Sequence, residues 1–205
     1  MVTVKLYVEG GGDTHPLRSK CREGFRKFLE KAGFTGKLPR IVACGSRQSA
    51  YDHFRTACES NEIAMLLIDS EDLVSADSPW EHLAHRPGDG FTKPPNATDD
   101  HCHLMVVCME SWFLADKEAL SRFFGHGFNE NVLPRNPNIE SILKSELFSA
   151  LAKATAHCRP REQYGKGKHS FDILIAISPA MVANSSPWAK RFLDKLKEFT
   201  ELVKT

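Results

Sequence analysis

The sequence predicts an α/β protein whose mainly parallel sheet is flanked by helices. Residues 63–68 (IAMLLI) form a continuous apolar run, which is typical of a strand buried on both faces. A strand-like run at residues 2–9 comes earlier, and helical patterns separate the strand-like runs. Regular alternation of strands and helices is typical of a parallel sheet with crossover helices.

The first half of the chain accounts for three strands and two helices. Residues 2–9 (VTVKLYVE) are expected to form the first strand, and a helix is expected to begin near Thr14 and to end at Gly33. Residues 40–44 (RIVAC) predict the second strand, after which Ser46 is placed to cap the second helix. The apolar run described above is then the third strand.

The second half of the chain predicts one more strand and mostly helices. The polar stretch 75–100 is rich in Pro, Gly, Asp and His, and we expect it to leave the sheet. Residues 103–109 (HLMVVCM) predict a fourth buried strand. Helices are expected at 111–124, 139–157, 171–177 and 187–203. We expect one domain over residues 1–205, with a core at about 1–125 and a helical C-terminal extension at about 126–205.

The composition is that of an ordinary globular protein, with 41% hydrophobic and 26% charged residues. The sequence has no bilayer-length apolar run and no signal-peptide pattern, so we expect a cytoplasmic protein with no membrane partner. Six scattered cysteines without a CxxC pair favour buried free thiols. A net charge of +1 argues against a general polyanion binder, so contact with nucleic acid would need a local basic surface or a partner.

Carboxylates follow three of the four predicted strands. Glu9 ends the first, Asp69 and Glu71 follow the third, and Glu110 follows the fourth. The carboxyl ends of parallel strands meet at one edge of a sheet, where ligands bind. Crowded carboxylates repel one another unless a divalent cation lies among them. A single acid in such a place often only caps a helix, but three strands ending alike favour a metal site for Mg²⁺ or Mn²⁺.

The stretches "YVEGGGD" and "LLIDSED" resemble the TOPRIM fold, in which a strand-ending Glu with a Gly-rich loop precedes an Asp-x-Asp pair. Glu71 departs from that pattern, because it keeps the carboxylate but is one methylene longer. The stretches "HLMVVCMESWFLAD", "YGKGKHS" and "SPWAKRFLDKL" extend the likeness to one TOPRIM-like family of bacterial proteins. Members of that family are thought to accompany AAA-type ATPases.

The resemblance implies an Mg²⁺- or Mn²⁺-dependent nuclease, similar to nucleases of the overcoming-lysogenisation-defect type and acting as the effector of a partner ATPase in bacterial antiphage defence. An oligomer formed through that partner is part of this expectation. Glu9 would be a general acid/base or metal ligand, and Asp69 and Glu71 would be metal ligands. The resemblance assigns a second metal position to Glu110 and Asp116. One lysine of "YGKGK" would stabilise phosphate charge, and the choice between Lys166 and Lys168 stays open.

Other residues suit a phosphate or nucleic-acid ligand. Gly10, Gly11 and Gly12 leave room for a phosphate beside Glu9. Arg47 is placed at a helix N-terminus, where guanidinium and amides both favour an anion. Arg159 and Arg161 lie in a basic loop that is expected to follow a nucleic-acid backbone, although such loops are often only solvated.

Two alternatives compete with the nuclease hypothesis. The first is a non-catalytic TOPRIM-like module that binds a partner protein or a nucleotide, and the second is phosphoryl transfer or hydrolysis on a small nucleotide at the same site. The complete acid set favours an enzyme, since a binding module would tolerate its loss.

A zinc site is a separate interpretation of residues 101–108. This stretch contains two histidines and two cysteines but lacks the spacing that zinc sites show.

Overall fold

The computed structural model describes residues 3–202 and contains a four-stranded parallel sheet. The strand order is β2-β1-β3-β4. The bounds are β1 (Lys5–Gly11), β2 (Arg40–Gly45), β3 (Ala64–Asp69) and β4 (Cys102–Met105). Every residue of β3 is buried, as the apolar run predicts for a strand covered on both faces. The predicted α/β class with a parallel sheet is therefore confirmed.

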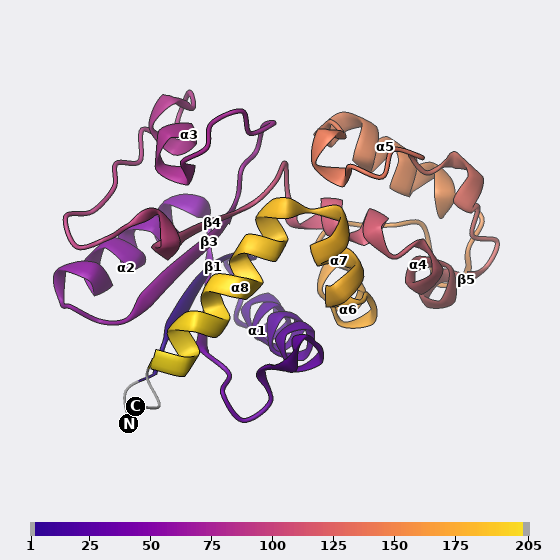
Figure 1. Cartoon of the computed structure of the whole chain (residues 1–205). Helices are drawn as coiled ribbons and strands as arrows, with labels where there is room; N and C mark the ends of the chain where they lie inside the picture. The colour runs from indigo at the N-terminus through magenta and orange to yellow at the C-terminus, as the bar shows by residue number, and fades with distance from the viewer. Residues whose placement is uncertain (1–2, 203–205) are drawn as a thin grey trace.

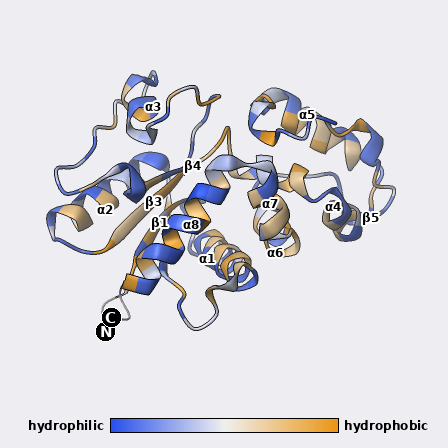
Figure 2. Cartoon of the chain, viewed as in Figure 1, coloured by the Kyte–Doolittle hydropathy of each residue, from blue (hydrophilic) through white to orange (hydrophobic). Residues whose placement is uncertain are grey.

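Helices cover both faces of this sheet (Figure 1). α2 (Arg47–Glu59) covers one face, and Tyr7 of β1 stacks there on a histidine ring of α2. α1 (His15–Leu29) and α8 (Pro187–Leu202) cover the other. α3 (Pro79–His85) lies in the polar excursion between β3 and β4. Figure 2 shows the apolar residues concentrated in the strands and on the inner sides of these helices.

The segment between β4 and α8 forms a helical part beside the sheet (Figure 1). α6 of this part packs against α1, and α8 then returns to β4. The C-terminal residues therefore complete the cover of the sheet as well as extending it. The elements are α4 (Lys117–Phe124), β5 (Gly125–His126), α5 (Lys144–Ala154), β6 (Arg159–Pro160), α6 (Ser170–Ala176) and α7 (Pro179–Ser185). Shorter helical turns lie at Glu30–Phe34, Asp99–His101, Met109–Ala115, Glu130–Val132 and Ile139–Ser141.

The fourth strand is shorter than predicted. β4 ends at Met105, and Val107 adopts a left-handed conformation with φ of 61°. The amide of Val107 donates to Ser70 Oγ at 2.7 Å instead of continuing the sheet, so the chain turns into a 3-10 helix. Glu110 therefore lies in that helix and not at the end of a strand, which corrects the prediction.

Two helical predictions also differ from the structure. The expected helix 111–124 is interrupted at Asp116, whose side chain caps α4 instead. The expected helix 139–157 is regular only in α5, because Ile142 and Leu143 are extended before it and the helix ends at Ala154. α7 was missed, although Pro179 occupies a position at which a helix commonly starts.

All six cysteines are buried and free, as predicted. Between residues 3 and 202, the structure contains no helix that combines the length and the apolar character needed to cross a bilayer.

Candidate metal centre

Three carboxylates converge where β1 and β3 end. Glu9 lies on β1, Asp69 is the last residue of β3, and Glu71 follows two positions later. One carboxylate oxygen from each lies within 4.8 Å of the other two. The parallel pairing of β1 with β3 produces this convergence, because it brings the same ends of both strands together. The cluster could hold a metal ion.

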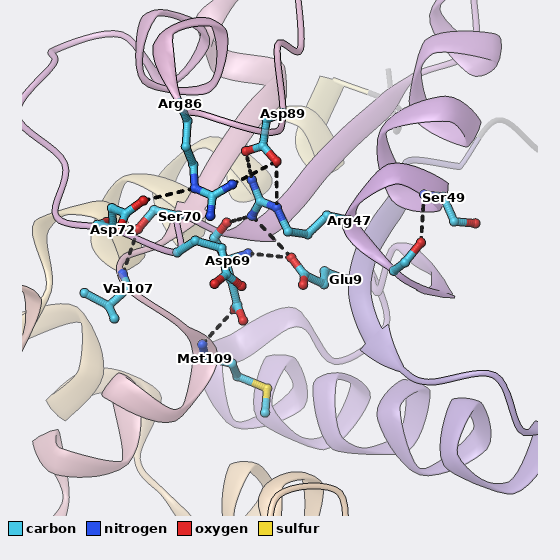
Figure 3. A network of polar contacts seen from close by, with 12 residues as sticks. Glu9, Arg47, Ser49, Asp69, Ser70, Asp72, Arg86, Asp89, Val107 and Met109 are labelled. Carbon is cyan, nitrogen blue, oxygen red and sulfur yellow. Dashed lines mark hydrogen bonds and ion pairs between the residues drawn. The ribbon is translucent and has the colours of Figure 1, made fainter. Parts of the chain in front are cut away.

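Backbone amides fix two of these acids in place (Figure 3). The amide of Asp69 donates to Glu9 Oε2 at 3.1 Å, and the amide of Met109 donates to Asp69 Oδ1 at 2.8 Å. The first bond joins β1 to β3, and the second joins β3 to the chain beyond β4. The two carboxylates are therefore positioned by the sheet itself.

Glu71 is held in an uncommon backbone conformation. Its φ is 68°, and its amide donates at 2.9 Å to the carbonyl of Val107, another non-glycine residue with a left-handed conformation. For residues with a Cβ, and above all for a β-branched valine, this region costs on the order of 1–3 kcal/mol and persists where the surroundings enforce it. Such strain is concentrated at functional sites, and here it places the third carboxylate beside the other two.

The electrostatics of the cluster disfavour three negative charges. Burial raises the pKa of Asp69 well above its ordinary value, and the carboxylates of Glu9 and Glu110 raise it further. Burial also raises the pKa of Glu9, while the guanidinium of Arg47 opposes the shift. A divalent cation among these oxygens would remove the repulsion.

Arg47 lies beside the acids, as predicted, but its guanidinium is already paired. It approaches Glu9 Oε2 to 3.5 Å and donates to the carbonyl oxygen of Asp69. Its Nε donates to Asp89 Oδ1 at 3.3 Å, and Arg86 binds the same Asp89 at 3.0 Å. Arg47 therefore joins the two strand ends and offsets their charge (Figure 3).

A cavity of about 310 Å³ opens beside the cluster. Its wall combines charged side chains with apolar ones and with a floor of glycines. The lining residues are Glu9, Gly10, Gly11, Gly12, Leu17, Gly45, Asp69, Met109, Glu110, Lys166, Gly167, Ser170 and Phe171. We call this cavity the acidic cleft.

The glycines of the cleft floor have two different explanations. A Cβ on Gly11 would lie 2.8 Å from the Cα of Arg18, so packing against α1 requires a glycine there. A Cβ on Gly12 would contact only Leu17, at 3.6 Å. Close approach by a phosphate therefore stays a prediction for Gly10 and Gly12, while Gly11 has a structural reason of its own.

Glu110 contributes a buried carboxylate to the cleft wall. Its side chain is 1% exposed, and its Oε1 accepts hydrogen bonds from Ser170 Oγ at 3.1 Å and from the Tyr164 hydroxyl at 3.3 Å. Its Oε2 has no hydrogen-bond partner among the described residues. A buried oxygen without a partner is costly, and the nearest cation is Lys166 Nζ at 4.0 Å.

Asp116 does not join this group. Its Oδ1 accepts from the amide of Ala119 at 2.9 Å and its Oδ2 accepts from the amide of Ser178 at 2.8 Å. It does not line the acidic cleft. Both oxygens hold backbone at the start of α4 and before α7, which contradicts the predicted metal role and explains why the residue is buried.

The basic residues separate into those near the cleft and those away from it. Lys166 lines the cleft, whereas Lys168 pairs with the exposed Glu162 at 2.5 Å, so the structure selects Lys166. Burial lowers the pKa of Lys166, but the charges of Glu110 and Asp69 outweigh this effect and the net shift of the pKa is upward.

The two arginines of the basic loop lie away from the cleft. Arg159 lies on β6, and Arg161 stacks on Phe123 at 4.0 Å. Neither arginine lines the cleft, so their placement does not support the predicted phosphate contacts.

Several residues of the site carried no sequence signal. Arg86 and Asp89 belong to the polar excursion, which has no periodic pattern that would place them at the sheet edge. Lys144 opens α5, yet its Nζ lies 2.5 Å from Glu71 Oε2. Ser170 reaches Glu110 across 60 positions. Each of these contacts depends on tertiary packing between distant segments.

The side chains present fit a hard divalent cation. The cluster offers carboxylate oxygens alone, which suit Mg²⁺, Ca²⁺ or Mn²⁺ better than zinc. The buried Oε2 of Glu110, which has no hydrogen-bond partner among the described residues, is an independent sign that the cleft can accept a ligand.

Fold and site together define an α/β protein with a carboxylate cluster at the carboxyl edge of a parallel sheet. Residues 8–197 match the profile of the DUF4276 family, described as a domain of unknown function, and the chain belongs to this family. No curated protein and no solved structure gives a significant match to the chain.

Proposed function

We propose that this protein is a TOPRIM-type nuclease that uses Mg²⁺ or Mn²⁺ to hydrolyse phosphodiester bonds. The observation that carries the proposal is the convergence of Glu9, Asp69 and Glu71 within 4.8 Å at the rim of a cleft that also contains Lys166. A cation held by these acids and the neighbouring lysine would provide the positive charge that a phosphodiester and its attacking water require. The glycines leave room for the phosphate.

Each side chain has a distinct part in this chemistry. Asp69 and Glu71 would hold the cation, which supplies charge neutralisation at the phosphate and an acidified water. Burial raises the pKa of Glu9, which suits a carboxyl that exchanges a proton with the attacking or leaving oxygen. Lys166 is a cation that lines the same cleft, and it would stabilise the charge that develops on the phosphate. Arg47 ties the ends of β1 and β3 together, because it contacts the carboxylate of Glu9 and the backbone carbonyl of Asp69.

The proposal includes regulation by a partner AAA-type ATPase in the bacterial cytoplasm. A net charge of +1 gives little general attraction to nucleic acid, and Arg159 and Arg161 lie outside the cleft lining. Affinity for a long polyanion then depends on the cation, on Lys166 and on surfaces that a partner or an oligomer would add. We therefore expect weak cleavage by the isolated chain and stronger cleavage with the partner.

The experiment is a cleavage assay on plasmid DNA and RNA in Mn²⁺, Mg²⁺ or EDTA, with and without a candidate partner AAA-type ATPase. We expect metal-dependent cleavage that Glu9→Gln abolishes while the fold is retained. The control is Glu162→Gln, which removes an exposed acid outside the cleft. Full activity in folded Glu9→Gln would favour the binding-module alternative.

A further inference from the structure

Lys144 makes a contact that the proposed chemistry does not use. It is the first residue of α5, and its Nζ lies 2.5 Å from Oε2 of Glu71, 73 positions away in the sequence. The bond joins the helical part to the carboxyl edge of the sheet. One of the three clustered carboxylates is therefore paired with an ammonium group.

This ammonium group and a divalent cation would compete for the same ligand. Glu71 Oε2 accepts a hydrogen bond from Lys144, while a Glu71 carboxylate oxygen lies within 4.8 Å of Glu9 and Asp69 oxygens. A cation bound by the three acids would withdraw negative charge from Glu71 and repel the ammonium group. Lys144 would then need another anion.

Lys144 and Lys166 are alike in that each pairs with an acid near the carboxyl edge of the sheet. Both lysines come from the helical part: Lys144 pairs with Glu71, which does not line the acidic cleft, and Lys166 lines the cleft and lies 4.0 Å from Glu110. The Lys144 side chain is 32% exposed, so solvent and ligands can reach it. Its flexible stem can carry the charge a few ångströms without moving the helix.

We propose that Lys144 is a phosphate-binding residue that Glu71 holds while no metal is bound and releases when a divalent cation takes Glu71. A phosphodiester ligated by the cation presents its remaining oxygens to the helical part, where Lys144 and Lys166 would bind them from two directions. Productive binding of nucleic acid then follows metal binding. This inference rests on the proposed metal site.

The mechanism gives two effects of opposite sign when Lys144 is removed. Metal binding becomes tighter because the competing ammonium group is gone. Binding of nucleic acid to the metal-loaded protein becomes weaker because a phosphate contact is lost. If the ion pair had only a structural role, removal of Lys144 would weaken both affinities or leave both unchanged.

The experiment measures the two affinities separately on the whole chain. Calorimetry gives the affinity for Mn²⁺ of the wild type and of Lys144→Gln, Lys144→Arg and Lys153→Ala. Lys153→Ala is the control, since Lys153 is exposed on the same helix. Anisotropy of fluorescein-labelled DNA and RNA oligonucleotides gives the second affinity, with Ca²⁺ in place of Mn²⁺ to suppress cleavage.

We expect Lys144→Gln to bind Mn²⁺ several-fold more tightly and the oligonucleotide about tenfold more weakly. Lys144→Arg should restore oligonucleotide binding, and Lys153→Ala should match the wild type. Weaker or unchanged Mn²⁺ binding by folded Lys144→Gln would overturn the inference while leaving the metal site intact. A wild-type protein that binds no Mn²⁺ would overturn both.

Discussion

The sheet carries two polar clusters that differ in how well their charges are matched. At the carboxyl ends of β1 and β3, carboxylates crowd together, and one nearby carboxylate oxygen, Glu110 Oε2, has no hydrogen-bond partner among the described residues. At the start of β4, His103 is buried between α8 and the sheet, yet both of its ring nitrogens have partners. The second cluster stabilises the fold, whereas the first could hold a metal ion.

The contacts of the histidines in the second cluster bear on the predicted zinc site in residues 101–108. Burial lowers the pKa of His103 to about 3, and the Arg191 guanidinium adds to the effect. The neutral ring donates from Nε2 to the Asp100 carbonyl at 3.0 Å and accepts at Nδ1 from Arg191 at 3.2 Å. His101 is bound to the Thr98 hydroxyl. These rings are engaged by protein groups, so the structure gives no support to zinc in this stretch.

The largest difference between the clusters should follow from Asp69→Asn. The amide keeps an acceptor for the Met109 amide but removes a charge that burial disfavours. We expect calorimetry to show loss of Mn²⁺ binding, and chemical denaturation to show an equal or larger free energy of unfolding without metal. A folded variant that binds Mn²⁺ like the wild type would contradict the site.

A matched pair of lysines tests the wall of the cleft. Lys166→Met removes a cation that lines the cleft, whereas Lys168→Met removes one that pairs with exposed Glu162. We expect cleavage to fall by at least about tenfold in the first variant, since a charge-assisted phosphate contact is lost, and to stay unchanged in the second. An equal loss of cleavage in both variants would mean that the position of Lys166 in the cleft has no special role.

Disrupting the matched cluster should cost stability and leave metal binding alone. Arg191→Met removes donors to the Cys102 carbonyl and to His103, so buried acceptors lose their partners. We expect urea denaturation to show a loss of about 2 kcal/mol in the free energy of unfolding, with unchanged Mn²⁺ affinity.

The control is Arg122→Met, which breaks only an exposed helical pair with Glu118. It should lower the free energy of unfolding by about 0.5 kcal/mol or less. A change in the metal affinity of Arg191→Met would show that the two clusters are coupled, contrary to this expectation.

The smallest effect is the pH dependence of stability that the acidic cluster contributes. Asp69 and Glu9 have raised pKa values in the folded protein, from ordinary values of 3.8 and 4.5. Their protonated forms favour folding, so this contribution is complete below the ordinary values and is lost as the pH rises through the folded ones. The lowered pKa of buried His103 acts in the opposite direction, so we compare the metal-free wild type with Asp69→Asn, and the stability of the wild type relative to the variant should fall as the pH rises. A difference that does not change with pH would show that Asp69 is not crowded.

The sequence was sufficient for the parallel sheet and for the convergence of Glu9, Asp69 and Glu71. Strand periodicity and the geometry of parallel sheets determine both, and both depend on short-range pattern. It was insufficient for Glu110, because an apolar run does not reveal that Ser70 takes the amide of Val107 and ends β4 early. We expected acids at the ends of three strands, but acids lie at the ends of only two of them, and Glu110 lies in a 3-10 helix.

Charge pairing was the part of the site that the sequence could not supply. Asp116 has a side chain of the kind that binds metals, but its carboxylate accepts from two backbone amides, one of them 62 positions away in the sequence. Arg47 was placed correctly at the sheet edge, while Asp89 reaches it from an excursion without periodicity. Such pairs depend on how distant loops pack, which local patterns do not encode.

Anomalous diffraction from crystals soaked in Mn²⁺ tests the central claim most directly. We expect a strong anomalous peak coordinated by oxygens of Glu9, Asp69 and Glu71, with the Lys144 ammonium group displaced from Glu71. The peak should be absent in Asp69→Asn crystals soaked in the same way. Wild-type crystals that show no peak between these three carboxylates, or that bind Mn²⁺ only at other residues, would contradict a metal site at this edge of the sheet.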